Sequence, residues 1–491
     1  MMRFLRIISA ILCVVLLCSS FAACGEDYKD AFIYIDFDAK PANLDPQLAS
    51  SDEELTVVRS LFDTLLRFDR AGNIVCSGAD TFTKEGNVYT FELNKNLKWV
   101  DGNHVTAQDY VFAFRRAVDP ETKAPFANSL FSIVNAKEIN SGNKSVTELG
   151  VKAVDDYTLK IELQSADSEF EKVLTTAVTM PCNEEYFVSC KGKYGLTLDT
   201  TPSCGSYYIR QWLTETKFLI RLAKNLDYTG EFEANSMRIY FTCGQDNAID
   251  MLSLDNTDLA YISNDEYSDI AAAGFKVVSV EDTCYTLFLS ERMDPELRRA
   301  FLTSINSDTF KENLLPNQRV AETLYPEILS ASGAAKTTDY ITHDVASASG
   351  IFASKTLEGV IPEDISVKYP ADTTALNVAR SLAAHWQQTL SCFMNIEETP
   401  IYTIRDMLNS TYYDIIIIPF SAPTGTVSAY NKKLGFKDST PAEISGQLFG
   451  DYRCYPLYYS SLNVAQGAKI QNLDEAMQGG IIDVSILIKM Q

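Results

Sequence analysis

The chain has 491 residues and a mass of 54.6 kDa, which is enough for roughly two to four domains of ordinary size. Hydrophobic residues make up 46% of it and charged residues 22%, which excludes general disorder. A formal charge of −23 argues against sequence-independent binding to nucleic acid, since that needs a basic surface facing phosphate. The three histidines, His104, His343 and His385, are far apart, so no local His-rich metal motif exists. We therefore expect neither a metal nor a nucleic-acid partner.

The first 23 residues predict an export signal. Arg3 and Arg6 precede an apolar run of about 11–12 residues, too short for a bilayer that needs about 20. The run ends in Phe21-Ala22-Ala23-Cys24, which resembles a bacterial lipobox with Phe21 where leucine is usual. We expect lipidation of Cys24 and anchoring on the outer or periplasmic face of the cell membrane. The alternative is a plain signal peptide that is cut nearby.

Eight further cysteines leave two alternatives open. They are Cys76, Cys182, Cys190, Cys204, Cys243, Cys284, Cys392 and Cys454. Eight cysteines admit 105 pairings, so the sequence cannot choose among them. Either all are small buried hydrophobic residues, or one or two disulfides form among Cys182, Cys190, Cys204 and Cys243.

The first half of the chain predicts strands that alternate with helices. Strands are expected at residues 32–35, 88–93, 159–163, 207–212, 217–222, 239–241 and 259–262. Helices are expected at residues 53–66, 107–117 and 246–254. Thr106 and Asp109 have the spacing of a capping box that would begin the second helix, and Asp119-Pro120 would end it. This rhythm indicates an α/β domain.

The pattern begins again near residue 278 and predicts a second α/β lobe. Strands are expected at residues 285–289, 367–370, 414–418 and 455–459, and helices at 295–305 and 374–390. Asp294 is a candidate helix cap, with Pro295 at the first helical position. The continuous apolar run at 415–418 indicates a strand covered on both faces. Residues 432–447 are polar and predict a loop.

The sequence lacks the common catalytic motifs. There is no GxSxG, HExxH, Walker loop or GxGxxG. We therefore predict that the chain is not an enzyme and that it needs no cofactor. A two-lobed exported protein without a catalytic motif is typically a binding protein, and pockets favour domain interfaces.

A series of short motifs runs along the chain: Leu44-Asp45-Pro46, residues 61–65, residues 89–102, residues 105–113 and Asp119-Pro120, followed by residues 204–208, 224–228 and 297–301. Together these segments resemble the family 5 extracellular solute-binding proteins, the oligopeptide and dipeptide receptors of ABC transporters. Each piece alone is weak, but their order and spacing are specific, and the resemblance covers nearly the whole mature chain.

The resemblance implies a two-lobed periplasmic-binding-protein-like fold, a type II, cluster C-like Venus flytrap with an extra subdomain in lobe I. The signal peptide would occupy residues 1–23 and lobe I residues 24–280, with the subdomain at about 56–164. Lobe II would be inserted at residues 281–455, and residues 456–491 would return to lobe I. Ligand would lie between the lobes and close them by hinge motion.

For function, the resemblance implies a monomeric receptor that delivers peptides to an ABC permease and its ATPase. Ligand-lining segments of the family align with Ser50, Ser51 and Asp52, and with Phe420, Ser421, Ala422 and Pro423. Pro423 stands where relatives have an aspartate that pairs with the peptide ammonium. Either another acid substitutes, with Asp52 the nearest candidate although a solvated helix-capping role fits it better, or the ligand has no free amino terminus.

Two other functions remain as alternatives at this point. The same fold could bind a non-peptide solute such as a nickel chelate, haem, an oligosaccharide or an opine-like molecule. In a different class, the chain could be a secreted hydrolase or a structural surface lipoprotein.

Overall fold

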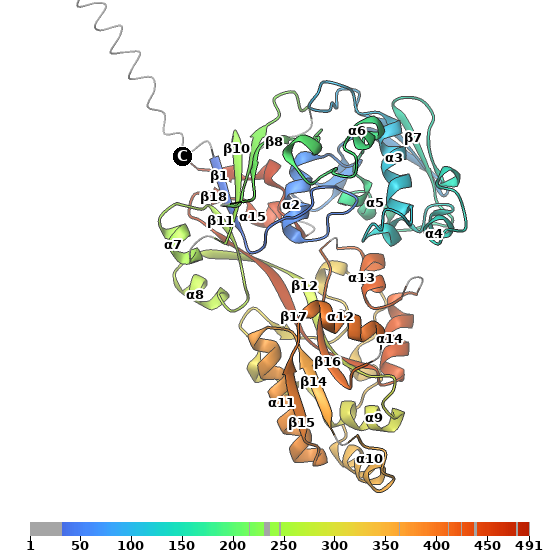
Figure 1. Ribbon diagram of the computed structural model, residues 1–491, viewed down its shortest axis with the longest axis vertical. Coiled ribbons are helices and arrows are strands. Elements are labelled where there is room, and N and C mark those ends of the chain that lie inside the picture. Colours follow the sequence, from blue (N-terminus) through green and yellow to red (C-terminus); the bar gives the residue numbers. More distant parts are fainter. Residues whose placement is uncertain are drawn as a thin grey trace, which may run out of the picture.

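The computed structural model describes residues 32–490 apart from 216, 230–235, 245–246, 363, 411, 424, 437–438 and 478–479. The predicted signal peptide and the predicted lipidation site, Cys24, lie outside the described residues. The described chain forms two lobes joined by long strands, with the predominantly blue-to-green first half above and the orange second half below in Figure 1.

One eleven-stranded sheet runs through both lobes, in the order β15-β14-β16-β12-β17-β11-β1-β10-β9-β8, with β13 paired to β17. The strands are β1 Phe32–Phe37, β2 Leu66–Phe68, β3 Ile74–Cys76, β4 Ala79–Glu85, β5 Val88–Leu93, β6 Val151–Ala153, β7 Thr158–Glu162, β8 Tyr207–Leu213, β9 Leu219–Lys224, β10 Arg238–Cys243, β11 Leu259–Ile262, β12 Lys276–Leu289, β13 Arg319–Val320, β14 Ile365–Tyr369, β15 Met394–Glu398, β16 Ile415–Ser421, β17 Cys454–Gln466, β18 Ile470–Gln471 and β19 Ile488–Lys489.

Helices cover this sheet in both lobes (Figure 1). The α-helices of the described residues are α2 Asp52–Leu61, α3 Ala107–Val118, α4 Ala136–Asn140, α5 Phe170–Val173, α6 Glu184–Ser189, α7 Ala248–Ser253, α8 Tyr267–Ala272, α9 Pro295–Ser304, α10 Val345–Leu357, α11 Thr373–Leu390, α12 Ile401–Ser410, α13 Val427–Lys433, α14 Pro441–Gly450 and α15 Leu473–Ala476.

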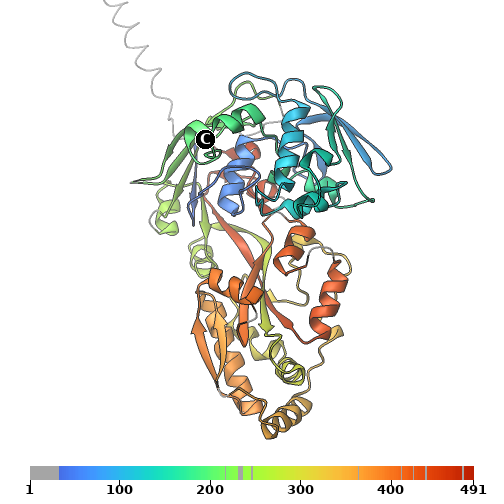
Figure 2. The ribbon, with the colours of Figure 1, turned by 45° about the vertical axis from the view of Figure 1, so that its right-hand side comes forward.

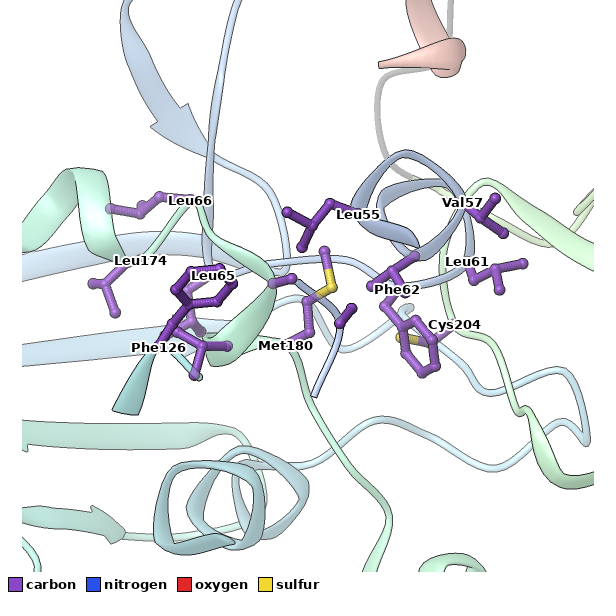
Figure 3. Close-up of a cluster of buried hydrophobic side chains, with 14 of the residues drawn as sticks. Leu55, Val57, Leu61, Phe62, Leu65, Leu66, Phe126, Leu174, Met180 and Cys204 are labelled. Carbon is purple, nitrogen blue, oxygen red and sulfur yellow. The ribbon is translucent and has the colours of Figure 1, made fainter. Parts of the chain in front are cut away.

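The core of lobe I forms where α2 packs on the sheet. In β1, Ile33, Ile35 and Phe37 are buried while the residues between them are half-buried, as expected for a strand with one covered face. Side chains of α2 and of the segment that follows it join one buried cluster with Phe126, Leu174, Met180 and Cys204 (Figure 3). This cluster fixes the position of the amino end of α2, which faces lobe II.

The last residues of the chain complete lobe I. The Lys489 ammonium donates a hydrogen bond to the Phe32 carbonyl at 2.9 Å and forms an ion pair with Asp258 at 2.9 Å. Its side chain is buried, so β1, near the start of the described chain, and β19, near its end, are held together.

A second, four-stranded antiparallel sheet of order β4-β5-β7-β6 lies beside the main sheet in lobe I. Helix α3 packs against it, and the capping box of Thr106 and Asp109 at the start of α3 is confirmed. The helix ends at Val118, directly before Asp119-Pro120, as predicted.

Lobe II has its own buried core. Ile415, Ile416, Ile417 and Ile418 in β16 are all fully buried, which confirms a strand covered on both faces. Helices α9 and α11 pack on each other, and the Trp386 indole donates a hydrogen bond to the Phe301 carbonyl at 3.2 Å. The predicted cap of α9 is also confirmed, because the Asp294 carboxylate accepts from the backbone of Glu296 and Leu297.

Two long strands connect the lobes. β12 and β17 pair antiparallel along almost their whole lengths and extend from one lobe into the other (Figure 2). Their register shifts between Glu281 and Thr283, so Asp282 is an extra residue on β12. Such a bulge bends a strand and redirects a side chain. The bulge lies where β12 leaves lobe I.

Two sequence predictions were wrong in detail. The helix predicted at 53–66 spans Asp52–Leu61, because the chain turns extended at Phe62 and continues into β2. The predicted loop at 432–447 contains most of α14, which begins at Pro441 behind a capping box of Thr440 and Glu443. The polar residues there are the exposed face and the cap of a helix, not a loop.

Candidate ligand-binding cleft

A cavity of about 680 Å³ lies between the lobes. Ser50, Ser51 and Asp52 line it from lobe I, and Phe420, Ser421 and Pro423 line it from lobe II. Six of the seven predicted ligand residues, separated by some 370 positions in the chain, therefore share one cavity. The seventh, Ala422, is buried behind the wall, where its N–H donates to the Asp282 carbonyl at 2.8 Å.

The wall from lobe I is held by one buried carboxylate. Ser51 caps α2, and Glu54 closes a capping box with it. The Glu54 carboxylate accepts backbone hydrogen bonds from Ala42, Asn43, Ser50 and Ser51 at 2.9–3.3 Å. Four N–H groups on one side chain fix the conformation of the loop that presents Ser50 and Asp52 to the cavity.

Asp52 does not cap the helix in solvent, which corrects the role favoured from the sequence. Ser51 is the cap, and Asp52 is the first helical residue. The Asp52 Oδ1 atom is covered and has no hydrogen-bond partner among the described residues. Burial, together with the neighbouring Asp282 and Glu53, raises the pKa of Asp52 well above its ordinary value. This carboxyl is therefore stabilised in its neutral form unless a cation approaches it.

The wall from lobe II is the end of β16 and the helix that follows it. The Lys433 ammonium, at the last residue of α13, donates a hydrogen bond to the Ser421 carbonyl at 2.6 Å and lies 3.4 Å from the Ser421 hydroxyl. Lys433, Lys432 and Arg405 all line the cavity. Pro423 lies beside them and offers neither charge nor N–H.

Asp282 and Lys433 are functional candidates that the sequence interpretation missed. Burial raises the pKa of Asp282 to about 6, with Lys433 opposing that rise. Burial and the nearby Arg405 lower the pKa of Lys433 to about 8, and Asp52 and Asp282 oppose that fall. The charges of Asp52 and Asp282 therefore act on the pKa of Lys433, and the charge of Lys433 acts on their pKa values. The sequence held one clue, the acidic pair Glu281-Asp282 inside a strand that carries no other acidic residue.

Hydrogen bonds join the two lobes beside this cavity. The Asn128 side chain, in the short helical turn Ala127–Leu130, donates to the Ser428 carbonyl at the start of α13. Lys432 donates to the Pro125 carbonyl at 3.2 Å, and the Ser129 and Thr426 hydroxyls are 3.4 Å apart. In this conformation the lobes touch over the cavity.

The described residues also form cavities outside the interlobe region. A cavity of about 430 Å³, lined by Trp99, Tyr186 and Tyr208 among others, lies wholly within lobe I. Within the described ranges, the eight cysteines are unpaired, and no group of three metal-binding side chains is arranged to hold an ion. Among the helices described, none is long and apolar enough to cross a membrane.

The fold and the interlobe cavity define a two-lobed binding protein of the periplasmic type. The sequence profile of the bacterial extracellular solute-binding proteins, family 5, matches residues 43–440. The chain belongs to this family.

Two curated relatives illustrate the similarity. The chain is 34% identical over 181 residues to the periplasmic oligopeptide-binding protein OppA of Escherichia coli, covering 36% of this chain and 33% of that one. It is 34% identical over 168 residues to the oligopeptide-binding protein OppA of Bacillus subtilis, covering 33% and 31%. The matched stretch thus spans about a third of the length of these relatives.

Solved structures match over nearly the whole fold. Listeria monocytogenes OppA bound to peptide superposes with a TM-score of 0.76 at 21% identity, covering 94% of this chain and 99% of that one. The E. coli murein tripeptide binding protein MppA gives 0.75 at 20% identity, covering 94% and 98%. At these identities the likeness shows the fold.

Proposed function

We propose that the chain is an extracytoplasmic receptor that captures peptides between its lobes and delivers them to an ABC permease and its ATPase. The observation that carries the proposal is the interlobe cavity, in which Ser50–Asp52 meet Phe420, Ser421 and Pro423 in a member of a solute-binding family. The relatives named as oligopeptide-binding proteins support peptides as the ligand class. Binding without turnover is the expected activity.

Native mass spectrometry of the purified protein tests the ligand class first. A retained mass that fragments as a peptide would support the proposal. A retained chelate, haem or sugar would refute peptides while keeping the receptor role. Hydrolysis of ester or peptide substrates would refute the receptor role itself.

We propose that the lobes divide at residues 24–280 and 456–491 for lobe I and 281–455 for lobe II, with an extra subdomain at about 56–164. β12 and β17 would then form the hinge, since both cross between the lobes. Small-angle scattering should give a smaller radius of gyration with bound peptide. Identical curves with and without saturating peptide would contradict a flytrap.

We also propose anchoring through a lipid on Cys24, based on the lipobox-like sequence before it. In cells, Cys24→Ala should release the protein into the soluble fraction or the medium. Unchanged membrane association of this variant would contradict the proposal.

A further inference from the structure

The sheet of lobe I has a basic hollow at its edge. In β8, β9 and β10, buried residues alternate with exposed or half-buried ones over most of each strand, so the sheet has one covered and one open side there. A hollow of about 460 Å³ lies at this edge. Four of the residues that line it are cationic, namely Arg210, Arg221, Lys224 and Arg238, and among the described residues that line it none is acidic. The chain as a whole has a formal charge of −23, so this surface is opposite in sign to the rest of the molecule.

The strand register brings the cations together. Phe32 in β1 lies opposite Arg238 in β10, which in turn lies opposite Ala223 in β9. Arg210 is the extra residue where the register of β8 shifts next to Arg221 of β9. The Arg238 guanidinium also lies over the Phe32 ring, 5.0 Å from its centroid. The basic hollow is therefore continuous with the first described residue of the chain.

Large apolar side chains lie among these cations. Leu226 and Met237 both line the hollow, and they are 76% and 45% exposed. Exposed apolar residues beside a group of cations are the composition of a surface that rests on anionic lipid, where the cations meet headgroups and the apolar side chains enter the headgroup layer.

The place where the described chain begins indicates where the bilayer lies. Phe32 lines the hollow and follows Cys24, the proposed lipidation site, by eight positions. At about 3.6 Å per residue, a connection of this length reaches at most about 29 Å. An anchored chain therefore keeps this side of lobe I close to the membrane. β8 and β10 lie in the part of lobe I away from lobe II (Figure 1), and the hollow shares no lining residue with the interlobe cavity.

We propose that the basic hollow of β8, β9 and β10 is a docking surface for the anionic membrane on which the chain is anchored. Phospholipid headgroups lie against its four cations, and Leu226 and Met237 enter the headgroup layer. The rest of the acidic molecule is repelled by the same lipids, so the contact fixes the orientation of the protein on the bilayer and leaves the interlobe cavity free.

Vesicle flotation tests this surface. The chain from residue 25 onward keeps every described residue and lacks both the predicted signal and Cys24, so the result does not depend on the proposed lipid anchor. It is mixed with vesicles of equal parts phosphatidylglycerol and phosphatidylcholine, or of phosphatidylcholine alone. The wild-type surface should bind the mixed vesicles roughly tenfold more tightly, because each cation near an anionic surface adds to the attraction. Salt at about 1 M, where the Debye length is about 3 Å, should remove the difference.

Two matched variants separate this surface from net charge. Arg210→Glu/Arg238→Glu should lower binding to the mixed vesicles to the level of the neutral ones. Arg299→Glu/Arg380→Glu makes the same change of charge on exposed residues of α9 and α11 in lobe II and should bind like the wild type. Urea midpoints check that each variant is folded, and Arg210→Gln/Arg238→Gln repeats the test without added acids. Equal losses in both Glu variants, or equal binding of the wild type to both kinds of vesicle, would overturn the proposal.

Discussion

Two residues in the motifs that resemble the family stabilise the fold through buried polar contacts. Asp45, in the first of the family-like segments, forms a buried ion pair with Arg116 in α3. Asp63, in the next segment, accepts hydrogen bonds from Ser77 at 2.6 Å and from Tyr228 at 2.9 Å, across 165 positions in the case of Tyr228. These two motif residues therefore join separate segments of lobe I and do not line the interlobe cavity.

Removal of the Arg116–Asp45 ion pair should lower the free energy of unfolding substantially. Arg116 also donates to the Gln47 side chain at 2.7 Å, and all three side chains are buried. Arg116→Met leaves the Asp45 charge uncompensated, which should cost about 3–5 kcal/mol of unfolding free energy. Urea denaturation measures this loss.

The exposed pair of Lys311 and Asp308 provides a matched control for that prediction. Lys311→Met also removes a cation from an ion pair, but water screens both partners there. Its urea midpoint should stay at the wild-type value. A similar destabilisation in both variants would show that burial is not what makes Arg116 important.

Asp282 should make stability depend on pH. Its folded pKa of about 6 lies above the ordinary value of 3.8, so the folded state binds more protons than the unfolded state between these values. The contribution of Asp282 is therefore greatest at low pH and is lost as the pH rises through 6. Asp282→Asn should gain stability relative to the wild type as the pH rises from 4 to 7. A constant difference between the two urea midpoints would contradict the shift.

At the scale of elements, the sequence predicted type and order well and boundaries less well. Periodicity located α3, α9 and α11, because their buried faces repeat at helical spacing and their caps are local. The helix predicted at 53–66 extended past the end of α2 at Leu61, because Phe62 and Leu65 continue the apolar pattern after the helix has ended. Periodicity missed α14, whose moderate apolar content looked like a loop. A bulge such as the one at Asp282 depends on the partner strand, which the sequence of β12 alone does not specify.

The candidate site was predicted only in part, because some of its residues come together only through contacts between segments that are distant in sequence. Ser50–Asp52 and Phe420–Pro423 were found through resemblance, because these segments occupy recognisable places in the family pattern. Asp282 and Lys433 were missed, because only the meeting of β12, β16 and α13 brings Lys433 into the cavity that Asp52 lines and places Asp282 behind its wall.

The loop before α2 should depend on Glu54. Glu54→Ala removes the acceptor of four backbone N–H groups, which should cost about 1–3 kcal/mol of stability and weaken peptide binding. Glu443 has the equivalent capping-box role at the start of α14 and does not line the cavity. Glu443→Ala should therefore leave peptide affinity, measured by calorimetry, unchanged. Equal losses of affinity in both variants would contradict a specific role for the Glu54 loop.

At the scale of the whole molecule, contacts between the lobes should set how long a ligand stays. Asn128→Ala removes the hydrogen bond from lobe I to the Ser428 carbonyl, worth about 1 kcal/mol. Peptide dissociation, followed by stopped-flow fluorescence, should become roughly fivefold faster. Asn140 makes the same kind of bond to Val118 within lobe I, so Asn140→Ala should leave the rate unchanged. Equal rates in Asn128→Ala and the wild type would show that this contact does not retain the ligand.

The two strands that join the lobes also determine the order in which the two lobes can fold during synthesis. A ribosome releases the chain from its amino end, so β1 emerges first, whereas β17 and Lys489, which complete the sheet and the buried ion pair of lobe I, emerge last. Lobe II needs only the segment between the two crossings and can finish folding while lobe I still waits for its final strand. Proteolysis of stalled nascent chains of increasing length should therefore find protection in lobe II before lobe I. The part of the molecule that is made first would be the last to reach its native form.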